Sequence, residues 1–129
     1  MKVLLDTSAF LWWVSGGGER LSERGRWAIE APGNDVFVSV ASAWEIAIKA
    51  ERGRLTLPLT AERYVPDLLR RFGLDVLPVE LPHALRAGAL PLHHRDPFDR
   101  LLIAQSQIEG LALVSADPAI GRYDVEVIW

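Results

Sequence analysis

The chain has 129 residues, of which 50% are hydrophobic, so it can bury one core but has no room for a second domain. The absence of cysteine excludes disulfides and cysteine-ligated zinc or iron–sulfur sites, and it fits a reducing, cytoplasmic setting. A formal charge of −3 argues against a protein that coats nucleic acid nonspecifically, although a local basic groove remains compatible with it.

The N-terminal part of the sequence predicts a strand, two helices and a second strand. Residues 2–5 are typical of a buried strand ending at Asp6, whose charge interrupts the apolar run too early for a signal peptide. Thr7 or Ser8 can cap the apolar helix that follows, and the glycines at 16–18 end it. A second helix is predicted from 22 to the turn at 32–34, followed by a strand at 36–40.

The middle of the chain predicts two helices and a strand. A helix over residues 41–52 carries Glu45 and ends before Gly53. Residues 60–73 are predicted to be helical, with Pro66 expected to kink or split the helix, and residues 75–79 form a third strand. A short helix is expected at 83–89.

The C-terminal part contains the clearest helix signal. Asp96 as N-cap and Pro97 at the first helical position predict a helix that runs to Gly110. Residues 111–115 and 125–129 are predicted strands, and no stretch of the sequence approaches the length of a membrane span, so we expect a soluble protein. The alternation of strands and helices predicts a single α/β domain over residues 1–129, with a mainly parallel central sheet covered by helices on both faces.

Four acidic residues occupy positions from which they can meet at one edge of such a sheet. Asp6 directly follows a strand and Asp117 lies two residues beyond Ser115 at the end of another, where ligands of parallel sheets gather. Glu45 and Asp99 lie in the first turns of helices. Two charges about 5 Å apart repel by roughly 3 kcal/mol at a dielectric near 20, so converging carboxylates need a cation. Oxygen ligands alone favour Mg²⁺ or Mn²⁺, which support hydrolysis of phosphodiesters.

Each acid also has an ordinary structural explanation. Asp6 and Asp117 can cap the segments that follow them, and Glu45 alone is typical of a solvated helix position. Asp99 lies in a first helical turn, where the helix dipole favours an acid. Spacing alone therefore leaves open whether the four carboxylates meet.

Four segments carry a family resemblance. They are Leu4-Leu5-Asp6-Thr7-Ser8-Ala9-Phe10-Leu11-Trp12, Ser42-Ala43-Trp44-Glu45-Ile46-Ala47-Ile48-Lys49, His94-Arg95-Asp96-Pro97-Phe98-Asp99-Arg100-Leu101-Leu102-Ile103-Ala104-Gln105 and Val114-Ser115-Ala116-Asp117. Together they resemble the PIN-domain toxins of the VapC type nearly from end to end. The resemblance implies a PIN fold, Mg²⁺-dependent cleavage of RNA, the role of toxin in a toxin–antitoxin pair, inhibition by a cognate antitoxin, and a homodimer.

The resemblance also assigns the metal-binding and catalytic roles, which fall on the four acids Asp6, Glu45, Asp99 and Asp117. The last segment has Ser115 where many relatives have threonine, and this exchange keeps the hydroxyl. We expect Asp6 and Asp99 to bind the ion most directly, and Glu45 and Asp117 to complete the site and help orient water.

Polar neighbours of the acids have two interpretations each. Asp96 can share a helix face with Asp99, but its position before a proline is already explained as an N-cap. Thr7 and Ser115 can hydrogen-bond the metal-bound carboxylates, or they can merely cap local structure.

Basic and aromatic residues near these segments are less specific. Arg100 and Lys49 can hold substrate phosphate or pair with the acids. His93 and His94 are expected to be loop or surface residues, because no cysteine or spaced third histidine accompanies them. Core or interface packing is expected, in preference to base stacking, for the five tryptophans Trp12, Trp13, Trp27, Trp44 and Trp129.

Three other functions fit the sequence less well. A Mg²⁺-dependent phosphatase with Asp6 as nucleophile needs a second acid two residues on, where this chain has Ser8. A phosphoacceptor receiver domain needs a second acid beside the first and a lysine after a late strand, and neither is evident. A catalytically silent RNA- or protein-binding module would keep the fold, but it would not need four retained acids.

Overall fold

The computed structural model describes residues 1–16 and 18–129, and its strands form one five-stranded sheet. The strands are β1 (Lys2–Leu5), β2 (Asp35–Ser39), β3 (Asp75–Leu77), β4 (Ala112–Val114) and β5 (Val127–Ile128). The helices are α1 (Thr7–Val14), α2 (Glu23–Glu30), α3 (Val40–Glu51), α4 (Ala61–Arg71), α5 (Leu81–Ala89) and α6 (Pro97–Glu109), with 3₁₀ turns η1 (Gly18–Arg20) and η2 (Ile120–Arg122).

The sheet has the order β3-β2-β1-β4-β5, and each neighbouring pair of strands is parallel. The first strand of the chain is therefore the central one. Leu5 at its end lies opposite Val38 of β2 and Val114 of β4. Asp6 consequently leaves the sheet at the same edge as the residues that follow β2 and β4.

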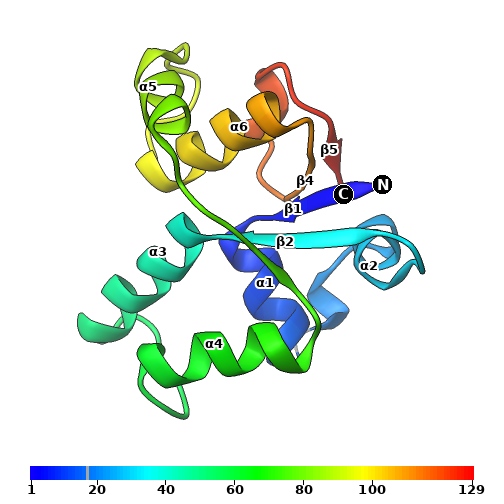
Figure 1. Ribbon diagram of the computed structural model, residues 1–129, viewed down its shortest axis with the longest axis vertical. Helices are drawn as coiled ribbons and strands as arrows, with labels where there is room; N and C mark the ends of the chain where they lie inside the picture. Colours follow the sequence, from blue (N-terminus) through cyan, green and yellow to red (C-terminus); the bar gives the residue numbers. More distant parts are fainter. Residues whose placement is uncertain (17) are drawn as a thin grey trace.

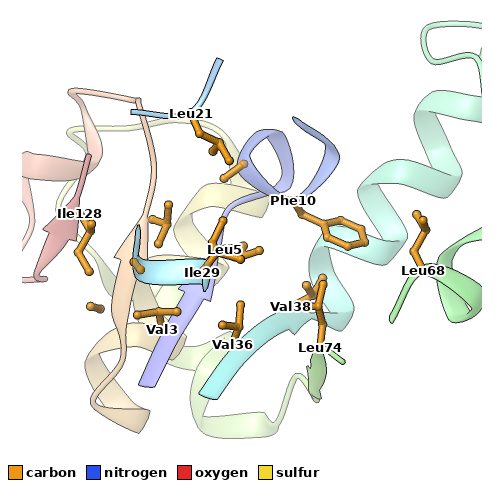
Figure 2. Packing of buried hydrophobic residues seen from close by; sticks show 14 of the residues in the cluster. Val3, Leu5, Phe10, Leu21, Ile29, Val36, Val38, Leu68, Leu74 and Ile128 are labelled. Atoms are coloured by element: carbon orange, nitrogen blue, oxygen red, sulfur yellow. The ribbon is translucent and has the colours of Figure 1, made fainter. Parts of the chain in front are cut away.

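Helices cover both faces of the sheet, as the sequence predicts. In Figure 1, α5 and α6 lie above the strands, whereas α1, α3 and α4 lie below them. Val3 and Leu5 of β1 point to the same side as Val36 and Val38 of β2, where they pack with residues of α1, α2, α3 and α4 (Figure 2). The alternate residue Leu4 faces the opposite core, which α6 covers.

Two details of the helices differ from the sequence prediction. Asp6, rather than Thr7 or Ser8, is the N-cap of α1, because its carboxylate accepts the Ala9 N–H at 2.8 Å. Pro66 does not split its helix, and α4 runs unbroken from residue 61 to residue 71. The strands β3, β4 and β5 are also shorter than predicted, and residue 40 begins α3 instead of ending β2.

The start and end of α6 match the prediction. Asp96 is the N-cap, and its Oδ1 accepts the N–H groups of Phe98 at 2.8 Å and Asp99 at 3.2 Å. Gly110 ends the helix in the left-handed conformation, at φ 68°, that glycine adopts without strain. Within the described ranges 1–16 and 18–129, no helix has the length and apolar character that crossing a bilayer requires.

Candidate metal centre

The four acids predicted to form a site line one cavity of about 440 Å³ at the carboxyl edge of the sheet. Asp6 comes from the end of β1, Glu45 from α3, Asp99 from α6 and Asp117 from the loop after β4. The structure thus supplies the convergence that spacing alone leaves open.

Asp6 is buried and held from two sides. Its Oδ1 accepts the N–H of Ala9 at 2.8 Å, and the Ser115 side chain also hydrogen-bonds it. Burial raises the pKa of Asp6 above its ordinary value, and the negative charges of Asp117 and Glu45 raise it further, against the two hydrogen bonds. Both the capping role and the place in the acid cluster therefore apply to this residue.

Glu45 is buried, and both of its carboxylate oxygens have partners. Oε1 accepts the hydroxyl of Thr7 at 2.6 Å, and this hydroxyl also lies 3.0 Å from that of Ser42. Oε2 forms an ion pair with Lys49 at 2.6 Å, one helical turn farther along α3. Thr7 therefore contacts the acid cluster, and Lys49 pairs with an acid as one of its two interpretations predicts.

Asp99 is partly buried and lies among other charged groups. Burial is the main cause that raises its pKa to about 7, and the negative charges of Asp96, Asp6 and Glu45 add to it, whereas His94 acts in the opposite direction. Near neutral pH this carboxyl group consequently retains a proton part of the time. A bound cation would favour the ionised form.

Asp117 is positioned by its own loop and by a histidine. Its backbone N–H donates to Ser115 Oγ at 3.1 Å, and its Oδ1 accepts the Ala119 N–H at 2.9 Å. Its Oδ2 lies 2.8 Å from Nε2 of His94, which is also 2.9 Å from Oδ2 of Asp99. The expectation of a loop position is right for His94, but its ring lies inside the site, which sequence reasoning missed.

Arg100 forms contacts that neither of its two interpretations includes, and a contact with substrate stays a prediction. Its guanidinium donates to the backbone carbonyls of Ala87, Leu90, Pro91 and His94 at 2.8 to 3.2 Å. The side chain is therefore used to fix the segment between α5 and α6, and it contacts neither the acids nor the cavity lining in the described part of the chain.

The tryptophans divide into two groups. Trp12, Trp13 and Trp129 pack against the core, and the rings of Trp12 and Trp129 lie 5.9 Å apart. Trp27 and Trp44 are each 61% exposed, so the expectation of core packing is wrong for these two, and an interface role for them stays a prediction.

The donor set fits a hard divalent cation. Carboxylate oxygens from four separate segments line the cavity, and buried negative charge raises the pKa values of Asp6 and Asp99. His94, Asp99 and Asp117 each bring one ligand-type atom within 4.8 Å of the others. A cation at this position would offset the repulsion among the carboxylates.

Comparisons with known proteins identify the family of this chain. A model of the PIN domain matches residues 3–126. Ribonuclease VapC16 of Mycobacterium tuberculosis is 46% identical over 56 residues, which amount to 43% of this chain and 40% of that protein. The alignment thus covers less than half the length of this curated relative. Within the aligned part, the predicted resemblance to VapC is confirmed.

Solved structures show the same fold over nearly the whole chain. VapBC2 from Rickettsia felis bound to a promoter DNA fragment has a TM-score of 0.73 at 14% identity, covering 98% of this chain and 97% of that one. DNA-bound VapBC from Salmonella typhimurium has a TM-score of 0.67 at 17% identity, covering 98% and 96%. Because the family model spans almost all of the sequence and the fold agrees, the chain belongs to the PIN domain family.

Proposed function

We propose that this protein is a Mg²⁺-dependent endoribonuclease that acts as the toxin of a type II toxin–antitoxin pair. The observation that carries the proposal is the meeting of Asp6, Glu45, Asp99 and Asp117 in one cavity. The partial match to a protein named ribonuclease VapC16 supports the same activity.

In this proposal the four acids hold the ion and the water around it. Asp6 and Asp99 bind Mg²⁺, or Mn²⁺ in its place, most directly, while Glu45 and Asp117 complete the site and orient water. The ion supplies Lewis acidity, which activates water and stabilises the leaving oxygen of a phosphodiester. Thr7 donates a hydrogen bond that fixes Glu45 before substrate arrives.

Lys49 supplies positive charge where the RNA backbone would lie. It is the one Lys or Arg among the described residues that line the cavity. About half of its side chain is exposed, so its ammonium group can reach solvent while it pairs with Glu45. We assign to it the attraction of the scissile phosphate.

Partner proteins are part of the same proposal. The solved VapBC neighbours are complexes, and one similar structure is named a toxin–antitoxin complex from Klebsiella pneumoniae. Leu81, Leu85 and Leu92 are 72%, 65% and 70% exposed, so apolar surface is available for a second protein. We assign a cognate antitoxin and a homodimer to this chain, with residues 1–129 as one PIN domain acting in the cytoplasm.

The proposal is tested by RNA cleavage with purified protein in Mg²⁺ or Mn²⁺, against EDTA. Asp6→Asn and Asp99→Asn should each abolish cleavage with the fold intact, because each loses a charged ligand. Asp124→Asn is the matched control, since Asp124 is exposed and outside the cavity. Undiminished cleavage by either site variant would contradict the assignment, and a wild type that neither cuts RNA nor binds metal would be a silent binding module.

A further inference from the structure

His94 lies between two of the four acids, Asp99 and Asp117, although the proposed function gives it no role. Its Nε2 is 2.8 Å from Oδ2 of Asp117 and 2.9 Å from Oδ2 of Asp99. The imidazole side chain is 17% exposed, so it is largely shielded from water. One nitrogen atom thus connects a carboxylate of α6 with a carboxylate of the loop after β4.

The other ring nitrogen determines which hydrogen-bonding role Nε2 has. Nδ1 of His94 faces the backbone N–H of Asp96 at 3.3 Å, and a backbone N–H can only donate. Nδ1 must therefore accept, which places the proton of the neutral ring on Nε2. That N–H donates to the two carboxylates, both of which are acceptors.

This assignment, with Nδ1 as acceptor and Nε2 as donor, argues against direct metal binding by His94. A histidine that binds a metal through one nitrogen usually carries its proton on the other and donates it to an acceptor. Here a proton on Nδ1 would point at the N–H of Asp96, which is a donor and cannot accept it. Oxygen atoms of the carboxylates remain the better ligands for a hard cation.

The backbone around His94 is fixed from two directions, so the ring is positioned in advance. The hydroxyl of Tyr123 accepts the N–H groups of His93 and His94 at 3.0 and 2.8 Å. Arg100 donates to the His94 carbonyl at 3.2 Å. Arg100 and Tyr123 therefore contribute to the site indirectly, by holding the loop that carries the imidazole.

We propose that His94 is a positioning residue of the metal centre, whose Nε2–H bridges Asp99 and Asp117 and holds them side by side without binding the ion. The inference rests on the proposed function, because it assumes that these carboxylates bind a metal. Without the bridge, repulsion would move Asp117 and its loop away from Asp99, and metal affinity would fall.

The first measurement is the affinity for Mn²⁺ by titration calorimetry, on wild type and three variants. His94→Ala should weaken binding about 10- to 100-fold, the usual effect of losing a partner that orients a metal ligand. His94→Gln should recover most of the loss, since its amide N–H can donate but does not replace an imidazole as ligand. His93→Gln is the matched control and should bind like wild type, because it keeps the backbone N–H that Tyr123 accepts and its side chain lies outside the cavity lining.

The second measurement is pulsed EPR of the bound Mn²⁺, which detects a directly coordinated imidazole nitrogen by its ¹⁴N coupling. We expect no such coupling in the wild type. A strong ¹⁴N coupling that disappears in His94→Ala would overturn the proposal and make His94 a ligand, as would Mn²⁺ affinity unaffected by His94→Ala.

Failure of the proposed function has a different signature from failure of the His94 role. A wild type that binds no Mn²⁺ would contradict the metal centre itself, and the inference about His94 with it. If His94→Ala does not fold, as judged by circular dichroism, His94→Gln and ¹⁵N NMR of the wild-type ring decide. A proton found on Nδ1 in place of Nε2 would overturn the bridge.

Discussion

Thr7 shows how one hydroxyl group prepares a buried carboxylate for function. Its Oγ1 lies 2.6 Å from Oε1 of Glu45 and 3.0 Å from the hydroxyl of Ser42. All three side chains are buried, so a polar group that lost one of these bonds would have little access to water. The hydrogen bonds therefore join α1 to α3 beneath the proposed metal.

Thr7→Val removes this hydroxyl and keeps the shape of the side chain. We expect the variant to lose roughly 1–3 kcal/mol of stability, because the Glu45 carboxylate would remain buried with one oxygen lacking its donor. Urea denaturation of metal-free protein measures the loss. Thr7→Ser restores the hydroxyl and serves as control; equal stability of all three proteins would show that Glu45 does not depend on Thr7.

At the residue scale, the sequence located the acids but not the histidine that joins them. Asp6 and Asp117 could be placed because strand ends of a parallel sheet share an edge, and Glu45 and Asp99 because of the family motifs. His94 lies in a loop whose path depends on Tyr123 and on Arg100, both fixed only by tertiary packing. Its membership in the same segment as Asp99 was the one available signal.

The helix α6 shows how an element's ends determine the site. The cap formed by Asp96 fixes the first turn, so that Asp99 points into the cavity. The same carboxylate is the second largest cause that raises the pKa of Asp99. Asp96 therefore stabilises the helix and strains the acid cluster at the same time.

These two effects of Asp96 can be separated by substitution. Asp96→Ala should destabilise the protein by about 1 kcal/mol, because the cap is lost. Asp96→Asn should keep nearly full stability, since asparagine caps as well as aspartate, and it should lower the pKa of Asp99 by removing a neighbouring charge. Thermal unfolding measures the loss of stability, and the pH dependence of Mn²⁺ binding reports the change in the pKa of Asp99. An equal loss of stability in both variants would argue against the cap.

Pro66 explains a failed prediction at the scale of the element. A proline inside a helix removes one hydrogen bond and is expected to disrupt it. In α4 the residue is exposed, as is Glu62, whose carbonyl loses its partner and can be hydrated instead. Val65 and Leu68 bury the opposite side of the helix in the core and hold it in place. Local sequence could not show that packing outweighs the proline.

Replacing Pro66 by alanine should therefore stabilise the protein. We expect a gain of roughly 1–3 kcal/mol, since alanine restores the hydrogen bond and suits a helix interior. Pro97→Ala is the matched control. Pro97 occupies the first position of α6, where a backbone N–H would have no partner within the helix, so proline costs no hydrogen bond there. Chemical denaturation of both variants measures the difference; no gain for Pro66→Ala would mean that α4 already accommodates the proline without loss.

At the scale of the whole molecule, the sheet order determines how the acids meet. The motifs and the alternation of elements predicted the parallel sheet and its covered faces, which the structure confirms. They did not predict the lengths of the outer strands. β5 has two residues and β3 has three. Such short segments depend on packing against β4 and β2 and have little sequence pattern of their own.

The acid cluster should make metal-free protein less stable as pH rises. Folding raises the pKa of Asp99 from 3.8 to about 7, so the native state binds the proton more tightly than the unfolded chain does. The stability that comes from protonated Asp99 is thus complete below pH 3.8 and is lost as pH rises through about 7. Asp99→Asn should remove this part of the pH dependence.

Thermal unfolding between pH 5 and pH 8 in EDTA, compared with Mg²⁺, measures the effect. The added ion should stabilise the protein more at pH 8 than at pH 5, and at 100 times its Kd the gain at pH 8 should be about 2.7 kcal/mol. An equal effect of Mg²⁺ at both pH values, or on Asp99→Asn and wild type alike, would contradict a metal held by the ionised Asp99.

The central position of β1 has a consequence for synthesis on the ribosome. The strand that carries Asp6 is made well before β4, with which it pairs. A growing chain can already present Asp6 and Glu45 while Asp99 and Asp117 are still untranslated. The acid centre therefore cannot assemble until β4 has joined the sheet, and any activity that needs all four acids can start only after that step.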